Sequence, residues 1–329
     1  MTILVTGGAG YIGSHVVKQL LDNNEEVLVL DNLETGHKEA VLGGKLLIGD
    51  LRDNEFMINV FRKNEIEGII HFAANSLVGE SMKNPYKYYE NNVYGTLCLL
   101  KQMVEHNIDK IVFSSTAATY GNPEEIPIKE DNPTNPTNVY GETKLTMERM
   151  FKWFNRIHGI DYISLRYFNA AGADKSGMIG ERHDPETHLI PNILMAAIKN
   201  ESIKMFGDDY PTRDGTCIRD YIHVTDLSDA HLLSFDYLRQ GKGSNIFNIG
   251  SQQGYTVKEV IEAAKVVLDK NIRIDVVSKR AGDPAILIAS SEKIKKELEW
   301  KPRYSDMRTI ISTAWNFMKN HHHRYNNER

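Results

Sequence analysis

The sequence predicts an α/β fold, with a doubly wound parallel sheet followed by a smaller α/β region. In the first half of the chain, short apolar runs alternate with segments of helical periodicity. Near-continuous apolar strands are typical of parallel sheets that helices cover on both faces. The first of these runs also leads directly into a glycine-rich turn, TGGAGYIG at 6–13, as expected where a strand passes into a helix.

The expected elements follow in regular order to Asn169. The predicted strands are 3–6, 26–31, 45–50, 68–73, 110–115 and 162–169, and the predicted helices begin near Tyr11, Asp53, Pro85 and Tyr140. Residues 170–186 are Gly-rich and charged, without periodicity. Beyond them we expect helices at 189–200, 224–239, 256–268 and 291–299, and strands at 202–206, 245–250 and 272–277.

This order suggests two domains. We predict a first domain at 1–169, which contains the parallel sheet, and a smaller second domain at 170–329, with residues of about 223–250 returning to the first domain. The chain shows no internal repeat or low-complexity tract.

Composition narrows the functional class. Lys and Arg total 39 against 44 Asp and Glu, a net charge of −5, which argues against nucleic acid as a partner. The two cysteines, Cys98 and Cys217, suit a reducing compartment. No apolar run approaches the ~20 residues of a membrane span, and the start lacks a signal-peptide pattern, so a cytoplasmic location is expected. The sequence NHHHR at 320–324 is interpreted as a polar tail, and no metal site is predicted.

The glycine turn predicts a dinucleotide site of the Rossmann type. Gly7, Gly10 and Gly13 follow the first strand, and Gly8, Gly10 and Gly13 also satisfy the fingerprint. Glycines allow a pyrophosphate to approach the backbone at a helix N-terminus. Asp31 ends the next strand, at the separation of roughly 20 residues expected for a carboxylate on the adenine ribose. Because a carboxylate there repels a 2′-phosphate, NAD is expected rather than NADP; the alternative is a glycine turn that merely packs.

A second carboxylate follows the third expected strand. Asp50 in GDLRD is a candidate for a hydrogen bond to the adenine amino group. The alternative interpretation is nearly as good, since an acid at this place also serves as a helix cap or turn residue.

Tyr140 and Lys144 in YGETK form a candidate catalytic pair. Residues four apart project from one face of a helix, and Tyr140 is expected in the first turn, where the helix dipole favours an anion. A free tyrosine has a pKa of about 10, and a neighbouring ammonium lowers an acid's pKa by about 1 to 3 units. Lys144 is therefore expected to lower the pKa of Tyr140. Without the cofactor motif, the same spacing describes an ordinary solvated pair.

The chain resembles the extended short-chain dehydrogenase/reductase family over essentially its whole length, and more narrowly that family's UDP-hexose 4-epimerases. The motifs that carry the resemblance occur in the same order: HFAANSLVGES, ENNVYGT, SSTAATYG, YGETK, RYFNAAG, GTCIRDYIHV and RAGDPA. It implies inversion of C4 of UDP-galactose to give UDP-glucose through a 4-keto intermediate, with Tyr140 as base, Lys144 lowering its pKa and Thr116 as a hydroxyl relay.

The residues after Thr116 separate the competing enzymes. Nucleotide-sugar dehydratases and decarboxylases of similar sequence carry an Asp or Glu pair there, whereas this chain has Ala117 and Ala118. An alternative from another class is a non-catalytic NAD-sensing regulator; such proteins can lack the Tyr and Lys that this chain retains.

The resemblance also implies binding residues. For NAD these are Gly7, Gly10, Tyr11, Ile12, Gly13, Asp31, Asn32, Asp50, Leu51, Phe72, Ala73, Ala74, Asn92, Ser114, Tyr140, Lys144 and Tyr167. For the UDP-sugar they are Thr116, Tyr140, Asn169, His188, Leu189, Phe206, Arg219, Tyr221, Arg280, Asp283 and Leu287. The two arginines suit a diphosphate, because a guanidinium binds phosphate oxygens in pairs.

Three positions depart from part of the family. Ser76 stands where some members have a lysine near the NAD pyrophosphate, and His188 where some have asparagine. Leu287 stands where a tyrosine in some members excludes N-acetyl sugars. The shorter leucine leads to the hypothesis that UDP-GlcNAc and UDP-GalNAc are also substrates.

The family also implies a homodimer through a four-helix bundle. The helices that begin near Pro85 and Tyr140 carry apolar faces, part of which covers the sheet. The residues that define these faces are Leu97, Leu100, Val104, Met147, Met150 and Phe154.

Overall fold

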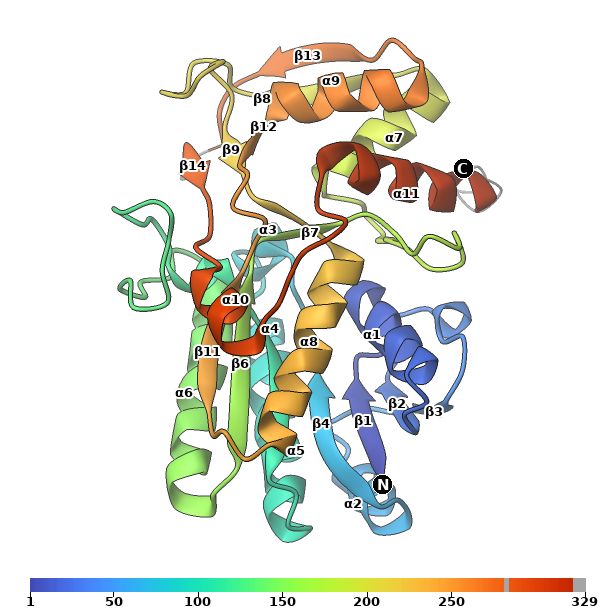
Figure 1. Cartoon of the computed structure of the whole chain (residues 1–329), viewed down its shortest axis with the longest axis vertical. Helices are drawn as coiled ribbons and strands as arrows, with labels where there is room; N and C mark the ends of the chain where they lie inside the picture. The colour runs from blue at the N-terminus through green and yellow to red at the C-terminus, as the bar shows by residue number, and fades with distance from the viewer. Residues whose placement is uncertain (281–283, 322–329) are drawn as a thin grey trace.

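The computed structural model describes residues 1–280 and 284–321. A seven-stranded sheet forms the lower part of Figure 1, and every neighbouring pair of its strands is parallel. The predicted doubly wound sheet is thus confirmed. Across the sheet the strands are β11 (Asn245–Ile249), β6 (Asp161–Tyr167), β5 (Lys110–Thr116), β4 (Ile66–His71), β1 (Thr2–Thr6), β2 (Val27–Asp31) and β3 (Lys45–Ile48).

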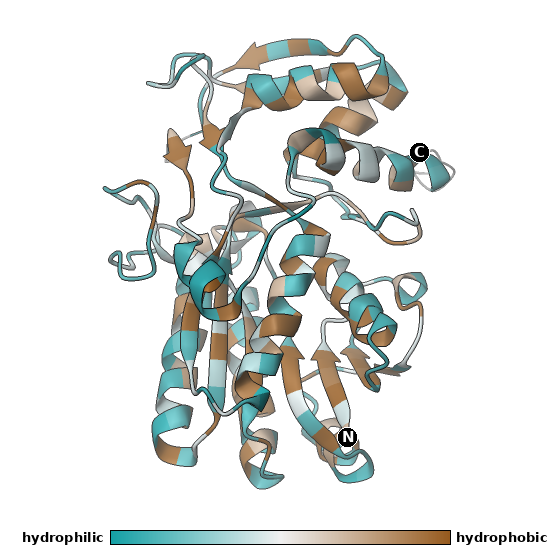
Figure 2. Ribbon diagram, viewed as in Figure 1, coloured by the Kyte–Doolittle hydropathy of each residue, from teal (hydrophilic) through white to brown (hydrophobic). Residues whose placement is uncertain are grey.

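Helices cover both faces of this sheet, whose central strands are largely apolar, as the brown segments of the strands in Figure 2 show. In β1, Ile3 and Val5 pack into one hydrophobic core and Leu4 into the other. The first core is closed by α1 (Tyr11–Asp22), α8 (Val224–Arg239) and α10 (Glu292–Leu298). The second is closed by α2 (Asn54–Lys63), α5 (Gly95–Glu105) and α6 (Val139–His158).

The helix predicted to begin near Pro85 consists of three consecutive pieces. Pro85 occupies the first turn of α4 (Pro85–Tyr88), and the Asn84 side chain accepts a hydrogen bond from the Lys87 amide. The chain then continues through η2 (Tyr89–Tyr94), a stretch of π-helix, into α5. Shorter turns lie in the loops at η1 (Lys38–Ala40), α3 (Val78–Ser81) and η3 (Ala117–Thr119).

A third hydrophobic core lies in the upper part of Figure 1. It is formed by α7 (Leu189–Lys199), α9 (Val257–Leu268), α11 (Met307–Asn320) and the parallel pair β8 (Ser202–Phe206) and β13 (Arg273–Val277). The sequence analysis did not predict α11. Its buried residues Met307, Ile310 and Ile311 do show helical spacing, but β-branched residues in the same stretch weaken a prediction from propensity.

Short strands connect the two layers of Figure 1. The pair β7 (Asn169–Ala171) and β10 (Tyr221–His223) is parallel, and a three-stranded sheet contains β12 (Tyr255–Thr256), β9 (Ile218–Arg219) and β14 (Ile286–Leu287).

The later half of the chain returns to the large sheet at three elements. These are α8, β11 and also α10, in which Lys293 Nζ donates to Asn245 Oδ1 at 2.6 Å and to the Ile246 carbonyl at 2.9 Å. The expected return of about 223–250 did not include α10. The domain division itself stays a prediction.

The strand order reverses between the neighbouring central strands β1 and β4: β2 and β3 extend from β1 to one edge of the sheet, and β5, β6 and β11 extend from β4 to the other. In such sheets ligands bind at the carboxyl ends of the strands beside the reversal. Among the described residues, no helix has the length and apolar character needed to span a membrane.

Candidate active site

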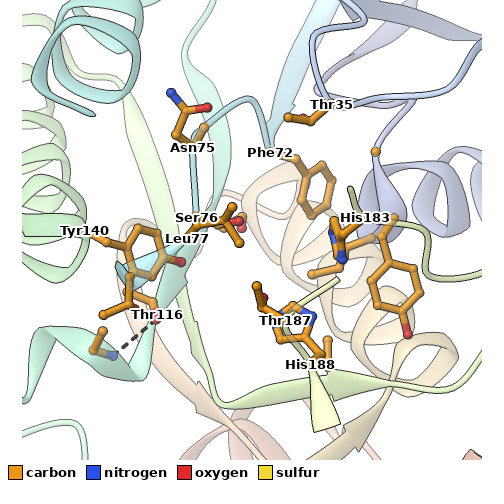
Figure 3. A pocket seen from close by; sticks show the side chains of 18 of the residues that line it. Thr35, Phe72, Asn75, Ser76, Leu77, Thr116, Tyr140, His183, Thr187 and His188 are labelled. Carbon is orange, nitrogen blue, oxygen red and sulfur yellow. Dashed lines mark hydrogen bonds between the residues drawn. The ribbon is translucent and has the colours of Figure 1, made fainter. Parts of the chain in front are cut away.

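A cavity of about 960 Å³ opens at the strand reversal. Its walls come from the loops after β1, β2, β4 and β5, from the first turn of α6, and from β7, β9, β10 and β14 above the sheet. Figure 3 shows Tyr140 and Thr116 on one side of this cavity and His183 and His188 on the other. This volume lies near the upper end for ligand pockets, so it suits a large ligand or two ligands end to end.

The glycine turn forms one end of the cavity, and its glycines are required by close packing. A Cβ at Gly7, whose φ is +71°, would lie 2.6 Å from the Ala73 nitrogen. A Cβ at Gly13 would lie 2.2 Å from the Gly7 carbonyl oxygen. Gly10 caps α1 in an extended conformation without a side-chain hydrogen bond, so the helix N-terminus remains available to an anion.

Asp31 lies at the end of β2, buried at the edge of the glycine turn. Its Oδ2 accepts a hydrogen bond from the Ala9 amide at 3.0 Å, and Oδ1 accepts one from the Leu33 amide at 2.9 Å. Burial raises the pKa of this carboxyl, and the two amides partly offset the effect. Asp31 therefore shapes the turn as well as lining the cavity.

Asp50 also lines the cavity, but its neighbours fit the turn interpretation. Its carboxylate accepts hydrogen bonds from the Arg52 amide at 2.9 Å, from the Arg52 guanidinium at 2.7 and 2.8 Å, and from Asn32 Nδ2 at 3.1 Å. The Arg52 side chain is the main reason that the pKa of Asp50 is lowered to about 2. A role toward adenine stays a prediction.

Tyr140 lies in the first turn of α6, as predicted. The Asn138 side chain caps this turn by accepting from the Gly141 amide at 2.9 Å, and the Tyr140 amide donates to Ser81 Oγ at 3.1 Å. The phenol lies beside Thr116 at the end of β5, near enough for the Thr116 hydroxyl to lower its pKa. The Thr116 hydroxyl in turn accepts from the Ala118 amide at 3.2 Å, the dashed line in Figure 3.

Lys144 follows one turn later, almost wholly buried. Its Nζ donates to the Ser114 carbonyl at 2.8 Å, lies 4.8 Å from the centre of the Phe113 ring, and lies 6.0 Å from the centre of the Tyr140 ring. Burial lowers the pKa of Lys144 to about 7, and the carboxylate of Glu148 opposes that shift.

The protein groups around Tyr140 raise its pKa, and the lowering of that pKa by Lys144 stays a prediction. Burial raises the pKa of Tyr140 to about 12, although the Thr116 hydroxyl lowers it. The physical reason is that removing a phenolate from water costs more free energy than one hydroxyl returns. Lys144, itself buried, is also disfavoured in its charged form.

Most of the residues expected to bind NAD line the cavity. Asn92 does not. It lies buried behind the wall, where its amide bonds both backbone groups of Asn75 at 2.8 and 3.0 Å and Thr143 Oγ1 at 3.1 Å. The residues that do line it are Gly7, Gly10, Tyr11, Ile12, Gly13, Asp31, Asn32, Asp50, Leu51, Phe72, Ala73, Ala74, Ser114, Tyr140, Lys144 and Tyr167.

The residues expected to bind the UDP-sugar converge from elements far apart in the sequence. Phe206 does not line the cavity but lies beneath Arg280, with the guanidinium carbon 3.9 Å from the ring centre. Asp283 lies outside the described residues. Those that line the cavity are Thr116, Tyr140, Asn169, His188, Leu189, Arg219, Tyr221, Arg280 and Leu287.

Several lining residues were not named by the sequence analysis. Asn75 and Leu77 flank Ser76 in the loop after β4, and the rule that ligands bind beyond strand carboxyl ends would have included them. Thr35, His183 and Thr187 lie in segments without periodicity, so only the tertiary structure places them there.

Comparison with known proteins agrees with this geometry. Residues 3–250 match the model of the NAD dependent epimerase/dehydratase family. The chain is 55% identical to the UDP-glucose 4-epimerase of Halalkalibacterium halodurans, over 100% of this chain and 98% of that protein. The structure of UDP-glucose 4-epimerase from Brucella ovis in complex with NAD is 43% identical, with a TM-score of 0.94 over 96% of this chain and 98% of that one. The enzyme from Bifidobacterium longum in complex with NAD+ and UDP is 36% identical, with a TM-score of 0.91 over 97% and 98%.

Proposed function

The chain belongs to the NAD-dependent epimerase/dehydratase family, and from this premise we propose that it inverts C4 of a UDP-hexose, interconverting UDP-galactose and UDP-glucose through a transient 4-keto sugar. One observation supports this proposal most strongly. At the carboxyl end of β5 the Tyr140 phenol lies beside the Thr116 hydroxyl, and the two residues after Thr116 are alanines. The site therefore offers groups that move one proton and no carboxylate at the place where elimination would need one.

The chain's own residues fit NAD. The glycine turn leaves room for nothing larger than a hydrogen at Gly7 and Gly13, and the N-terminus of α1 suits a pyrophosphate. The Asp31 carboxylate at the end of β2 suits ribose hydroxyls and disfavours a 2′-phosphate. When bound, NAD supplies the acceptor for the C4 hydride, and its positively charged ring favours the ionised form of Tyr140.

Tyr140 and Thr116 move the hydroxyl proton of the sugar. As the C4–H bond gives up its electron pair as hydride, the O4–H bond breaks, the proton passes to Thr116, and Thr116 passes its own proton to Tyr140. The oxygen becomes the 4-keto group. After the sugar turns over, Tyr140 and Thr116 would return the proton to O4 as C4 is reduced from its opposite face.

Lys144 lowers the energy of the ionised phenol. A pKa of about 12 for Tyr140 must fall by ~5 units for ionisation near pH 7, which corresponds to ~7 kcal/mol. Lys144, with its pKa held near 7 by burial, can gain a proton at little cost when a negative charge develops beside it. The carboxylate of Glu148, one turn along α6, also favours that charged form.

Two arginines serve the diphosphate of the substrate. Arg219 and Arg280 line the end of the cavity away from the glycine turn, in a chain whose net charge is −5. The anionic ligand therefore needs charges that the fold places locally. Phe206 packs against the Arg280 guanidinium and restricts its orientation, which favours paired hydrogen bonds to phosphate oxygens.

Incubation of the purified protein with UDP-galactose tests the function. We expect UDP-glucose as the product without added NAD and without net NADH. The Tyr140→Phe variant should be slower by a factor of about 10² to 10⁴, the usual contribution of a general base. Thr116→Ser should retain activity and Thr116→Ala should lose most of it. Full activity of Tyr140→Phe would contradict the mechanism, and a dehydrated or decarboxylated product would contradict the function.

We further propose that N-acetylated substrates are accepted. Leu287 on β14 lines the cavity beside Arg219, its partner in the parallel register of β14 and β9. A leucine there leaves more room than a tyrosine. Assays with UDP-GlcNAc should show conversion to UDP-GalNAc, and Leu287→Tyr should abolish it while retaining UDP-galactose turnover; conversion of plain hexoses alone removes this proposal.

We propose a homodimer through α5 and α6. Of the residues expected on the apolar faces, Leu100 and Met147 are fully buried, and Val104, Met150 and Phe154 pack partly against the core. The exposed apolar side chains of this surface are Tyr94, Leu97, Trp153 and Ile157. Exposed apolar groups clustered on two adjacent helices favour a partner surface.

The mass of the particle in solution checks the dimer. Light scattering should give twice the chain mass for the native protein. Trp153→Glu combined with Ile157→Glu should give a folded monomer, and a native protein of single-chain mass would exclude the proposal. A cytoplasmic location is also proposed, supported by the small number of cysteines, Cys98 and Cys217, which suits a reducing compartment. Cell fractionation tests it.

A further inference from the structure

Four metal-ligating side chains converge in the loop between β7 and α7, where the sequence analysis predicts no metal site. They are Glu181, His183, Glu186 and His188, and one ligand atom from each lies within 4.8 Å of the others. Figure 3 shows the two histidines next to each other, across the cavity from Tyr140. They therefore stand apart from the groups that move the proton.

Three of the four spacings between histidine nitrogens and carboxylate oxygens suit a small cation, whereas His188 Nδ1 and Glu181 lie closer together than two ligands of one ion. His183 Nδ1 lies 3.3 Å from Glu181 Oε1 and 3.7 Å from Glu186 Oε2, and His188 Nδ1 lies 3.7 Å from Glu186 Oε1 and in contact with Glu181. Ligands on a tetrahedral zinc ion, with bonds of about 2.1 Å, lie about 3.4 Å from one another. Both imidazoles present the same nitrogen to both carboxylates.

The two carboxylates of the cluster are buried, whereas the side chains of His183 and His188 are 25% and 53% exposed. The side chains of Glu181 and Glu186 are only 6% and 8% exposed. His183 Nδ1 is buried and makes no hydrogen bond of normal geometry, although two carboxylates lie near it. A buried polar atom without a partner is costly, and coordination to a cation would satisfy it together with both carboxylates.

Protonation of the two histidines is the alternative explanation of the same cluster. Burial alone would lower the pKa of His183, but hydrogen bonding to the neighbouring carboxylates outweighs it and raises that pKa to about 10. Two imidazolium–carboxylate pairs would then neutralise the charges. This account leaves the geometry of His183 Nδ1 unexplained, because a protonated nitrogen should point its hydrogen at one of the two oxygens.

We propose that Glu181, His183, Glu186 and His188 form a structural zinc site. Two imidazole nitrogens with two carboxylate oxygens match the donors that zinc takes, and four protein ligands make a closed site without an open position for water. The ion ties residues 181–188 into one rigid loop. That loop ends at the N-terminus of α7, where His188 and Leu189 line the cavity, and it packs edge-on against Tyr11, with the Tyr11 and His183 ring centres 6.3 Å apart.

Metal analysis of the intact protein tests the site without reference to catalysis. Protein purified without chelator and dialysed against metal-free buffer should retain about one zinc per chain. X-ray absorption at the zinc edge should show only nitrogen and oxygen ligands. Removal of the zinc with a strong chelator should lower the thermal unfolding midpoint by roughly 5 °C, and added zinc should restore it.

Two variants separate this site from other histidines. His183→Ala should reduce bound zinc to below about 0.1 per chain. The matched control replaces His321, His322 and His323 with alanine, and it should keep the zinc. If His183→Ala fails to fold, the absorption spectrum of the native protein still decides the question, since sulfur ligands would assign the ion to cysteine. The proposal is overturned by sulfur ligands, by zinc lost with the tail variant, or by a native protein that binds no added zinc and shows no thermal shift.

Discussion

The ion pair of Glu148 and Arg166 provides the sharpest test of the packing behind the catalytic residues. The pair joins α6 to β6, and both side chains are about 95% buried, with exposures of 4% and 5%. Arg166 NH2 lies 2.6 Å from Glu148 Oε2, and Arg166 Nε donates to Oε1 at 2.9 Å. The same carboxylate accepts from Ser115 Oγ, next to Thr116 on β5. Replacing the carboxylate by an amide leaves the guanidinium buried without its counter-charge.

We expect Glu148→Gln to lower the free energy of unfolding by about 3 to 5 kcal/mol, the cost of an uncompensated buried charge. With a urea m-value of ~3 kcal/mol/M for a chain of this size, the unfolding midpoint falls by about 1 to 1.7 M. Tryptophan fluorescence during urea titration measures it. The matched control is Arg149→Gln, which removes an exposed pair at 3.6 Å to Glu142 and should cost less than about 0.5 kcal/mol.

The double variant Glu148→Leu with Arg166→Met completes this test. Removing both charges together should recover most of the loss, because apolar groups of similar volume need no counter-charge. A cost below about 1 kcal/mol for Glu148→Gln would refute the reasoning, as would a double variant whose cost equals the sum of the two single costs.

The remaining predictions concern pH, the glycine turn and cofactor choice. Burial lowers the pKa of His71 to about 3, so the stability it contributes is complete above pH 6.5 and is lost as pH falls toward 3. At pH 5 that loss is ~2 kcal/mol. The urea unfolding midpoint should therefore fall less between pH 6.5 and pH 5 in His71→Asn than in the native protein. The exposed control, His158→Asn, should show the same fall as the native protein. Gly13→Ala should lower the free energy of unfolding by about 1–3 kcal/mol and should lose bound NAD, measured by the absorbance of the released cofactor. Gly79→Ala, with open space around it, should retain its stability and its bound NAD. Asp31→Ser should raise the affinity for NADP relative to NAD by about tenfold in a binding titration; an unchanged ratio would mean that Asp31 does not select the cofactor.

The sequence predicted those features whose cause is local. Most strands of the large sheet were recognisable because they are buried on both faces and are therefore largely apolar, with the partly exposed edge strand β3 as an exception. The glycine turn was recognisable because only glycine fits at such positions. At Gly13, for example, a Cβ would lie 2.2 Å from the Gly7 carbonyl oxygen. Tyr140 and Lys144 were placed on one helix face by their separation of four residues, which fixes their direction whatever lies around them.

The features that could not be predicted from the sequence depend on contacts between residues that are distant in the chain. Asn92 was expected at the cofactor, but the packing of η2 against α6 directs its amide to Asn75 and Thr143. Phe206 supports Arg280 from β8, a relation between two strands that no local pattern encodes. The pKa of Tyr140 is raised because the phenol is buried, and the extent of burial is a property of the folded chain alone.

The amino-acid sequence by itself determined the order of strands and helices, the dinucleotide turn and the pairing of Tyr140 with Lys144 on one helix face, because each arises from residues close together in the chain. Only the tertiary structure decided which side chains share the cavity, how burial sets their protonation, and how Glu181, His183, Glu186 and His188 meet around one point. Those outcomes depend on distances across the fold, and such distances are fixed when the hydrophobic cores pack.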